Sequence, residues 1–190
     1  MAKILLALHG FHSSPNSLKI QQMDAYLTQY FPEITLVCPQ LPCLPEQMWE
    51  TIKAIFEQHK TDQIAVMGSS LGGYLATKAA SVYQTKTLLI NPAVAPYRLL
   101  QCYAGMQTHP YTADNYLIDE DYMAHLKALE VTCLRDPQKY WVLLQKADQI
   151  LDYREAAEKY KQCKITCEAG GDHSFIGFDR YLSDIIQFLF

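Results

Sequence analysis

The feature that most constrains the fold is a repeated alternation of short apolar runs with longer segments of helical periodicity. The candidate strands are residues 3–8, 34–38, 64–67, 87–90, 140–144 and 165–167. Between and after them, apolar residues recur at helical spacing in segments that begin near Pro45, Leu71, Tyr153 and Phe178. Apolar strands separated by helices predict βαβ units, and therefore an α/β fold with a parallel sheet covered on both faces.

The first helical segment has a clear start. Ser14 and Pro15 supply an N-cap residue and a first-turn proline, and apolar residues follow at helical spacing from Ile20 to Phe31. We therefore expect the first helix to begin at Ser14 and Pro15.

One stretch interrupts the alternation. Residues 93–137 are irregular and rich in tyrosine, with one helical piece near residues 119–129. An insertion of this size in a compact α/β domain usually forms a lid or a binding loop. We expect one domain over residues 1–190, with a lid insertion at about 93–137.

Charge and hydropathy exclude several classes of protein. Sixteen basic and twenty acidic residues give a net charge of −4, which provides no basic patch for nucleic acid or anionic lipid. No apolar run approaches the length of a membrane span. The apolar run of residues 4–8 is shorter than the core of a signal peptide and ends in His9 and Gly10 instead of a cleavage site. We expect a cytoplasmic protein.

The six cysteines are an even number, so a disulfide framework has to be considered. Cys163 and Cys167 are expected to share a strand, where four residues span about 13 Å, too far for a disulfide bond. No C-x-x-C pair or zinc-finger spacing of cysteine and histidine is present. The sequence therefore predicts buried free thiols and no metal site.

The strongest motif lies at the end of the third candidate strand, where residues 68–72 read Gly-Ser-Ser-Leu-Gly and match G-x-S-x-G. A strand leads into the motif and the helical segment 71–83 leads out, the setting in which such a serine is a nucleophile. The turn is so crowded that only glycines fit two residues before and after the serine. We predict Ser70 as the nucleophile. The alternatives are Ser69, which lacks the flanking glycines, and an anion-binding turn.

A serine nucleophile needs a general base. His173 directly follows the last candidate strand, so it lies at the carboxyl edge of the sheet, where α/β folds bind ligands. His9 and His12 also follow a strand, but they precede Ser70, whereas this architecture runs serine, acid, histidine along the chain. We predict His173 as the base. The other histidines are interpreted as surface residues: His59, His109 and His125.

The acid that orients the histidine is expected after the preceding strand, residues 140–144. Asp148 lies in the loop that follows, within reach of an imidazole Nδ1. Asp152 stands where a helix begins and has a local interpretation as an N-cap. Asp172 is adjacent to His173 in sequence and is expected to point elsewhere. We predict Asp148 as the acid, with Asp152 as the alternative.

An acyl-transfer site also needs two N–H groups to hold the developing oxyanion. One is expected from Leu71, directly after the nucleophile. The other is expected from Phe11, because Gly10 allows the loop after the first strand to turn its backbone toward the serine. We expect the side chain of His9 to be structural.

Together these motifs resemble the α/β-hydrolase superfamily over the whole chain, and within it the small bacterial YqiA-like esterases. The closer resemblance rests on three stretches: residues 9–15, 91–94 and 170–175. It implies a minimal three-layer α/β-hydrolase fold, with the six parallel strands and one small lid. It also implies a serine esterase for carboxylic esters or acyl thioesters, with Ser70, Asp148 and His173 as catalytic triad and no cofactor.

The implied partner is a small acyl ester or thioester, and the chain is expected to be a monomer or a small homo-oligomer. Tyrosines of the insertion are candidates for lining an acyl pocket, with ordinary packing as the alternative: Tyr97, Tyr103, Tyr111, Tyr116 and Tyr122. A ligand receptor without catalytic turnover is the alternative function, because α/β-hydrolase folds also serve as binding proteins.

Overall fold

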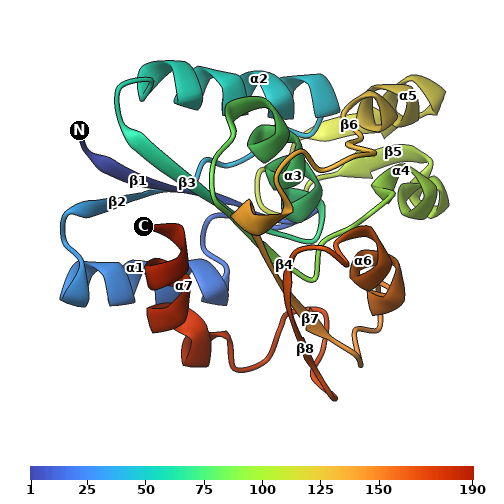
Figure 1. Ribbon diagram of the computed structural model, residues 1–190. Helices are drawn as coiled ribbons and strands as arrows, with labels where there is room; N and C mark the ends of the chain where they lie inside the picture. The colour runs from blue at the N-terminus through green and yellow to red at the C-terminus, as the bar shows by residue number, and fades with distance from the viewer.

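A computed structural model describes residues 1–190 and contains a six-stranded sheet in the order β2-β1-β3-β4-β7-β8 (Figure 1). Every neighbouring pair of strands in it is parallel. The strands are β1 (Lys3–Leu8), β2 (Ile34–Val37), β3 (Gln63–Ser69), β4 (Thr87–Ile90), β7 (Tyr140–Gln145) and β8 (Lys164–Glu168). The predicted parallel sheet is confirmed.

Helices cover both faces of this sheet and complete three layers (Figure 1). One face carries α1 (Leu18–Tyr30) and α7 (Leu182–Leu189), which follows the short helix η3 (Phe178–Tyr181). The other carries α2 (Pro45–Gln58), α3 (Leu71–Tyr83) and α6 (Tyr153–Lys159). The arrangement is the one predicted from the alternation of apolar runs and helical segments.

The apolar strands form two hydrophobic cores because successive side chains of a strand point to opposite faces. In β1, Leu6 and Leu8 pack in the core beneath α2 and α3, while Leu5 and Ala7 pack in the core beneath α1 and α7. The strand β7 divides its side chains between the two cores in the same way. A strand buried on both faces needs apolar residues at every position, as these runs provide.

The segment between β4 and β7 is more regular than predicted. It contains α4 (Pro96–Leu99), η1 (Leu100–Tyr103), an antiparallel hairpin of β5 (Gly105–Thr108) and β6 (Asn115–Ile118), α5 (Glu120–Ala128) and η2 (Pro137–Lys139). The predicted helical piece is α5, and Asp119 is its N-cap, because the Asp119 side chain accepts a hydrogen bond from Tyr122 N at 2.9 Å. Its residue Leu126 accepts a hydrogen bond from Tyr74 Oη of α3 at 2.8 Å, which ties the segment to the main domain core.

Two local predictions were wrong. The first helix begins at Leu18 with Ser17 as N-cap, because the Ser14 hydroxyl instead accepts a hydrogen bond from Asn16 N in a turn before the helix. His109 is buried and not a surface residue. Its Nδ1 accepts hydrogen bonds from the N–H groups of Tyr111 and Thr112, so it closes the turn between β5 and β6.

The cysteines are free, as predicted, but their predicted burial was wrong. Cys102, Cys133 and Cys167 are exposed, and the other three are only partly buried. Cys102 lies on the short helix η1, Cys133 in the loop between α5 and η2, and Cys167 on the edge strand β8.

The start of α3 lies against the carboxyl end of β1 with no room for a side chain at their contact. A Cβ at Gly72 would stand 2.0 Å from the carbonyl oxygen of Leu8, and a Cβ at Gly68 would stand 2.2 Å from that of Gly72. The crowding predicted from the G-x-S-x-G motif is therefore present. It brings the turn between β3 and α3 to the edge of the sheet, beside the loop that follows β1.

We predict that Gly72→Ala lowers the free energy of unfolding by about 3 kcal/mol or more, because its Cβ would overlap a main-chain oxygen fixed within the sheet. For a chain of this size that loss corresponds to a fall in Tm of about 6 to 12 °C. The control is Gly170→Ala, where φ is +76° but no atom lies within 4 Å, so that only backbone strain of about 1 kcal/mol is added. Equal melting temperatures for the two variants would contradict this packing argument.

Candidate active site

Ser70 occupies the sharp turn between β3 and α3 with a strained backbone, at φ +55° and ψ −121°. Its N–H donates to Ile90 O at 3.1 Å, and its carbonyl oxygen accepts from Gly73 N and Ala93 N, each at 3.0 Å. Strain of this kind persists only where surrounding contacts fix it, and such positions cluster at functional sites. The turn therefore holds the Ser70 side chain in one place above the sheet.

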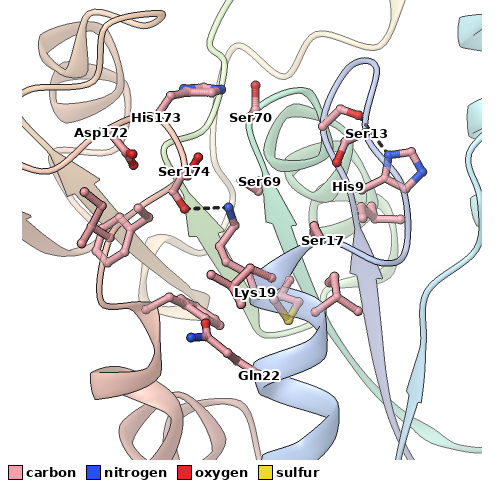
Figure 2. A pocket seen from close by; sticks show the side chains of 18 of the residues that line it. His9, Ser13, Ser17, Lys19, Gln22, Ser69, Ser70, Asp172, His173 and Ser174 are labelled. Carbon is pink, nitrogen blue, oxygen red and sulfur yellow. Dashed lines mark hydrogen bonds between the residues drawn. The ribbon is translucent and has the colours of Figure 1, made fainter. Parts of the chain in front are cut away.

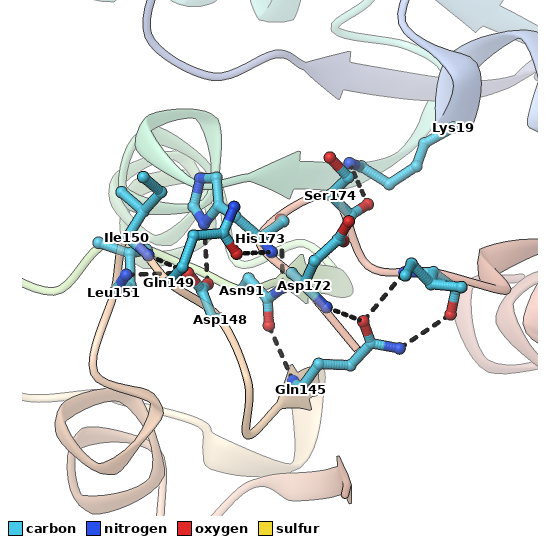
Figure 3. Close-up of polar contacts among 11 residues, drawn as sticks. Lys19, Asn91, Gln145, Asp148, Gln149, Ile150, Leu151, Asp172, His173 and Ser174 are labelled. Carbon is cyan, nitrogen blue, oxygen red and sulfur yellow. Dashed lines mark hydrogen bonds and ion pairs between the residues drawn. The ribbon is translucent and has the colours of Figure 1, made fainter. Parts of the chain in front are cut away.

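His173 and Asp148 meet from the loops that follow β8 and β7. His173 Nδ1 lies 2.8 Å from Asp148 Oδ2, and the Asp148 side chain is only 2% exposed (Figure 3). The other oxygen, Oδ1, accepts hydrogen bonds from the N–H groups of Ile150 at 2.8 Å and Leu151 at 2.9 Å. An ionised carboxylate only accepts, so Nδ1 carries the proton and Nε2 is left with a free lone pair.

Burial and hydrogen bonding act against each other on the Asp148 carboxyl. Burial on its own would raise the pKa of Asp148. The hydrogen bonds from His173, Leu151 and Ile150, together with the charge that His173 carries when protonated, outweigh that effect and lower the pKa. The carboxyl is thus ionised at neutral pH, the form that orients an imidazole.

Ser70 and His173 line one cavity of about 450 Å³, which lies between α1 and the loop that carries the histidine (Figure 2). Both side chains stand at the same end of this cavity. No hydrogen bond joins Ser70 Oγ to the imidazole in this structure. Catalytic hydrogen bonds are often long before substrate binds and shorten in the complex. The structure therefore brings nucleophile and base candidates to one cavity without a direct bond between them.

The loop after β1 lies directly beside Ser70. A Cβ at Gly10 would stand 3.2 Å from Ser70 Cβ and 3.7 Å from Ser70 Oγ. The next residue, Phe11, lines the same cavity, and its N–H donates no hydrogen bond within the protein. Leu71 is the first residue of α3, so its N–H has no acceptor within the helix. Two N–H groups are thus available next to the serine.

His9 is structural, as expected from the sequence. It is buried, and its Nε2 accepts a hydrogen bond from Leu41 N at 3.0 Å, while Nδ1 lies 2.9 Å from Gly10 O. Burial lowers the pKa of His9, the carbonyl of Gly10 raises it, and the nearby His109 lowers it again. A neutral ring that donates from Nδ1 fits all these contacts and fixes the Gly10 carbonyl.

Asp152 and Asp172 do not bind the imidazole. Asp152 caps α6 and forms an ion pair with Arg154 at 2.6 Å, the local interpretation considered for it. The side chain of Asp172 accepts no hydrogen bond, and its Oδ1 is buried without a partner. Of the three candidate acids, the structure brings only Asp148 to His173.

The tyrosines proposed for the pocket do not line the cavity that Ser70 and His173 share. Tyr97 donates a hydrogen bond to Glu130, Tyr111 is mostly exposed, and the ring of Tyr103 packs edge-on against Phe11 at 5.3 Å. Tyr116 and Tyr122 are buried in the larger core. Tyr116 lies beside the loop of Gly10 and Phe11, but it lines a different and much smaller cavity with them.

Two buried polar residues to which the sequence analysis assigned no role hold the loop of His173 (Figure 3). Asn91 Nδ2 donates to the carbonyl oxygens of Asp172 at 3.0 Å and His173 at 3.2 Å, and Asn91 Oδ1 accepts from Gln145 N. Gln145 Oε1 accepts from Asp172 N at 3.0 Å and Ile176 N at 2.9 Å. Asn91 directly follows the apolar strand β4, and Gln145 is the last residue of the apolar strand β7. A polar residue at the end of a buried strand was the signal in the sequence that could have identified them.

The parallel sheet, its helical layers and the strained serine turn between β3 and α3 define the α/β-hydrolase fold. Within this class, the chain belongs to the family described as Uncharacterised protein family UPF0227, which matches residues 4–190. The resemblance drawn from the sequence motifs is therefore confirmed.

Solved structures share this fold at low sequence identity. A protein from Agrobacterium vitis S4 matches with a TM-score of 0.76 and 17% identity over 100% of this chain and 88% of that one. Est1E from Butyrivibrio proteoclasticus with bound ferulic acid matches with a TM-score of 0.73 and 12% identity, over 98% of this chain and 89% of that one. Mouse alpha/beta hydrolase domain-containing protein 10 matches with a TM-score of 0.73 and 15% identity, over 98% of this chain and 91% of that one. No helix here has the length and apolar character needed to cross a membrane.

We predict that Gln145→Leu loosens the loop of His173. The change leaves the N–H groups of Asp172 and Ile176 without their acceptor, at a cost of about 1 to 3 kcal/mol for each buried donor. Hydrogen exchange measured by NMR should become at least tenfold faster at both amides. Gln149→Leu is the matched control, because exposed Gln149 accepts only from His173 N. Unchanged protection of Asp172 and Ile176 in Gln145→Leu would contradict the assigned role.

Proposed function

We propose that the protein is a serine esterase that hydrolyses carboxylic esters or acyl thioesters, with Ser70 as nucleophile, His173 as general base and Asp148 as the acid. The observation that carries the proposal is the 2.8 Å contact between His173 and buried Asp148, at the cavity where the strained turn presents Ser70. A carboxylate, an imidazole and a serine in this relation are the components of acyl transfer through a covalent intermediate.

In the proposed reaction, His173 Nε2 takes the proton of Ser70 Oγ while the oxygen attacks the acyl carbonyl. The imidazolium then gives this proton to the departing alcohol or thiol, which leaves an acyl group on Ser70. Water attacks this ester with the same histidine as base, and the carboxylic acid departs. Asp148 keeps the proton on Nδ1 and stabilises the imidazolium charge.

The negative charge of the tetrahedral intermediate needs hydrogen-bond donors fixed in advance. We assign this role to the N–H groups of Phe11 and Leu71. The assignment is supported by the close approach of Gly10 to Ser70, by the free N–H of Phe11, and by the position of Leu71 at the start of α3. His9 holds the Gly10 carbonyl and so sets the direction of the next N–H.

Residues 1–190 form one domain in this proposal, and residues 93–137 act as its cover. The cover rests on the loop after β1, since Tyr116 Oη lies 2.7 Å from His12 Nε2 and Tyr103 packs on Phe11. The fold relatives support the reaction class, because Est1E was solved with ferulic acid and another relative is the thioesterase domain of curacin biosynthesis.

We predict that Ser70→Ala loses a thousandfold or more of the kcat for p-nitrophenyl acetate, because triad members act as a unit. The variant should also lose labelling by a fluorophosphonate probe. Ser69→Ala is the control and should keep both properties. Full turnover by Ser70→Ala would overturn the proposal, and labelling of the unaltered protein without turnover of any ester would favour a ligand receptor.

The two candidate acids are separated by a paired comparison. Asp148→Asn should reduce kcat by a hundredfold or more, because an amide cannot hold the proton of Nδ1 in the required tautomer. Asp152→Asn should change kcat by less than threefold, since the Asp152 carboxylate contacts Arg154 and the start of α6. The measurement is kcat for the same ester at saturating concentration, and a larger loss in Asp152→Asn would contradict the assignment.

A further inference from the structure

We propose that the cavity beside Ser70 binds a neutral substrate group that both accepts and donates a hydrogen bond, namely an amide, between Lys19 and Asp172. The inference rests on the proposed esterase function and adds the chemistry that the substrate presents next to its scissile bond. It applies to an amide on either side of that bond, in the acyl part or in the leaving group.

Polar side chains face each other across the cavity where it extends away from the serine. One wall is the first turn of α1 with Ser17, Lys19 and Gln22, and the facing wall is the loop with Asp172 and Ser174 (Figure 2). Its volume of about 450 Å³ leaves space for a short chain of atoms beyond an acyl carbonyl held at Ser70. Apolar side chains such as Ile20, Met67 and Phe175 make up much of the remaining lining. Sites of this kind take their specificity from a small number of polar groups, and here Lys19 and Asp172 are the charged ones.

Lys19 places an incompletely paired cation in this cavity. Its Nζ crosses to the facing wall and donates to Ser174 O at 2.8 Å, and no carboxylate lies within ion-pair distance. Two of the three N–H groups of the ammonium therefore have no partner in the protein. Burial lowers the pKa of Lys19 and the charge of Asp172 raises it again, so the two side chains act on each other across the cavity.

Asp172 places an unpaired acceptor on the other wall. Neither carboxylate oxygen accepts a hydrogen bond from the protein: Oδ1 is buried without a partner, and Oδ2 is the accessible oxygen at the cavity that Asp172 lines. The backbone of this residue is fixed, because Asn91 binds its carbonyl oxygen and Gln145 binds its N–H. A buried polar atom without a partner is rare in folded proteins and needs a reason.

The signs of the two charges select the ligand. An anion would be attracted by Lys19 but repelled by Asp172, and a cation would be attracted by Asp172 but repelled by Lys19. An alkyl chain would displace water from both groups and leave both unpaired, which is costly. An amide satisfies both, because its carbonyl oxygen accepts from Lys19 while its N–H donates to Asp172.

The test compares kcat/KM within two matched pairs of substrates. In the acyl pair, p-nitrophenyl N-acetyl-β-alaninate is compared with p-nitrophenyl hexanoate, which has the same chain length without the amide. In the leaving-group pair, S-acetyl-N-acetylcysteamine is compared with S-pentyl thioacetate. We expect the amide substrate to be preferred at least tenfold in one of the pairs.

Substitutions connect that preference to the two side chains. Lys19→Met and Asp172→Ala should each reduce the ratio of amide to alkyl kcat/KM by tenfold or more. Lys19→Arg, which keeps the charge and the donors, and Asp172→Asn, which keeps an acceptor oxygen, should retain most of it. Lys53→Met, on exposed α2 surface, is the matched control and should leave the ratio unchanged.

Two results would contradict this substrate inference without contradicting the proposed esterase function. One is an equal or better turnover of the alkyl substrate in both pairs. The other is an amide preference that survives in both Lys19→Met and Asp172→Ala. If none of the four substrates is hydrolysed and Ser70 is not labelled by a fluorophosphonate, the proposed function itself is wrong, and the substrate inference falls with it.

Discussion

The close approach of α3 to the end of β1 is the contact on which the rest of the site depends. Gly72 allows it, because any Cβ there would overlap the carbonyl oxygen of Leu8. The approach forces a sharp turn after β3, and the hydrogen bonds from Ser70 N and to Ser70 O fix the strained conformation of that residue. It also sets Gly10 against Ser70, so one packing constraint positions both the serine and the adjoining backbone N–H groups.

A second set of contacts delivers the histidine and its carboxylate to the same edge of the sheet. Asn91 and Gln145 end neighbouring parallel strands and bind the backbone of the loop that carries His173. Asp148 comes from the loop after β7 and is itself held by the N–H groups of Ile150 and Leu151. The rigid sheet thus positions the loops that follow β4, β7 and β8. The fixed backbone of the loop after β8 also leaves the Asp172 side chain at the cavity.

The sequence predicted the sheet, the helical layers and the turn at Ser70 because their causes are local: apolar strands, helical spacing and glycines at the crowded positions. The hairpin of β5 and β6 was missed because Met106 and Leu117 are exposed, which hides the alternation of a half-buried strand. Lys19 and Asp172 could not be assigned, since only the tertiary fold brings the first turn of α1 to the loop after β8. The contact of Asp148 with His173 required the geometry of two loops.

The most direct test of the central claim is to trap the acyl group on the protein. The protein is mixed with p-nitrophenyl acetate, the reaction is stopped with acid during turnover, and the peptides are mapped by mass spectrometry. The account predicts one acetyl group on the peptide that contains Ser70, absent when the protein is denatured before the ester is added. Turnover with the acetyl group on another residue, or with no acetylated peptide when deacylation limits the rate, would contradict it.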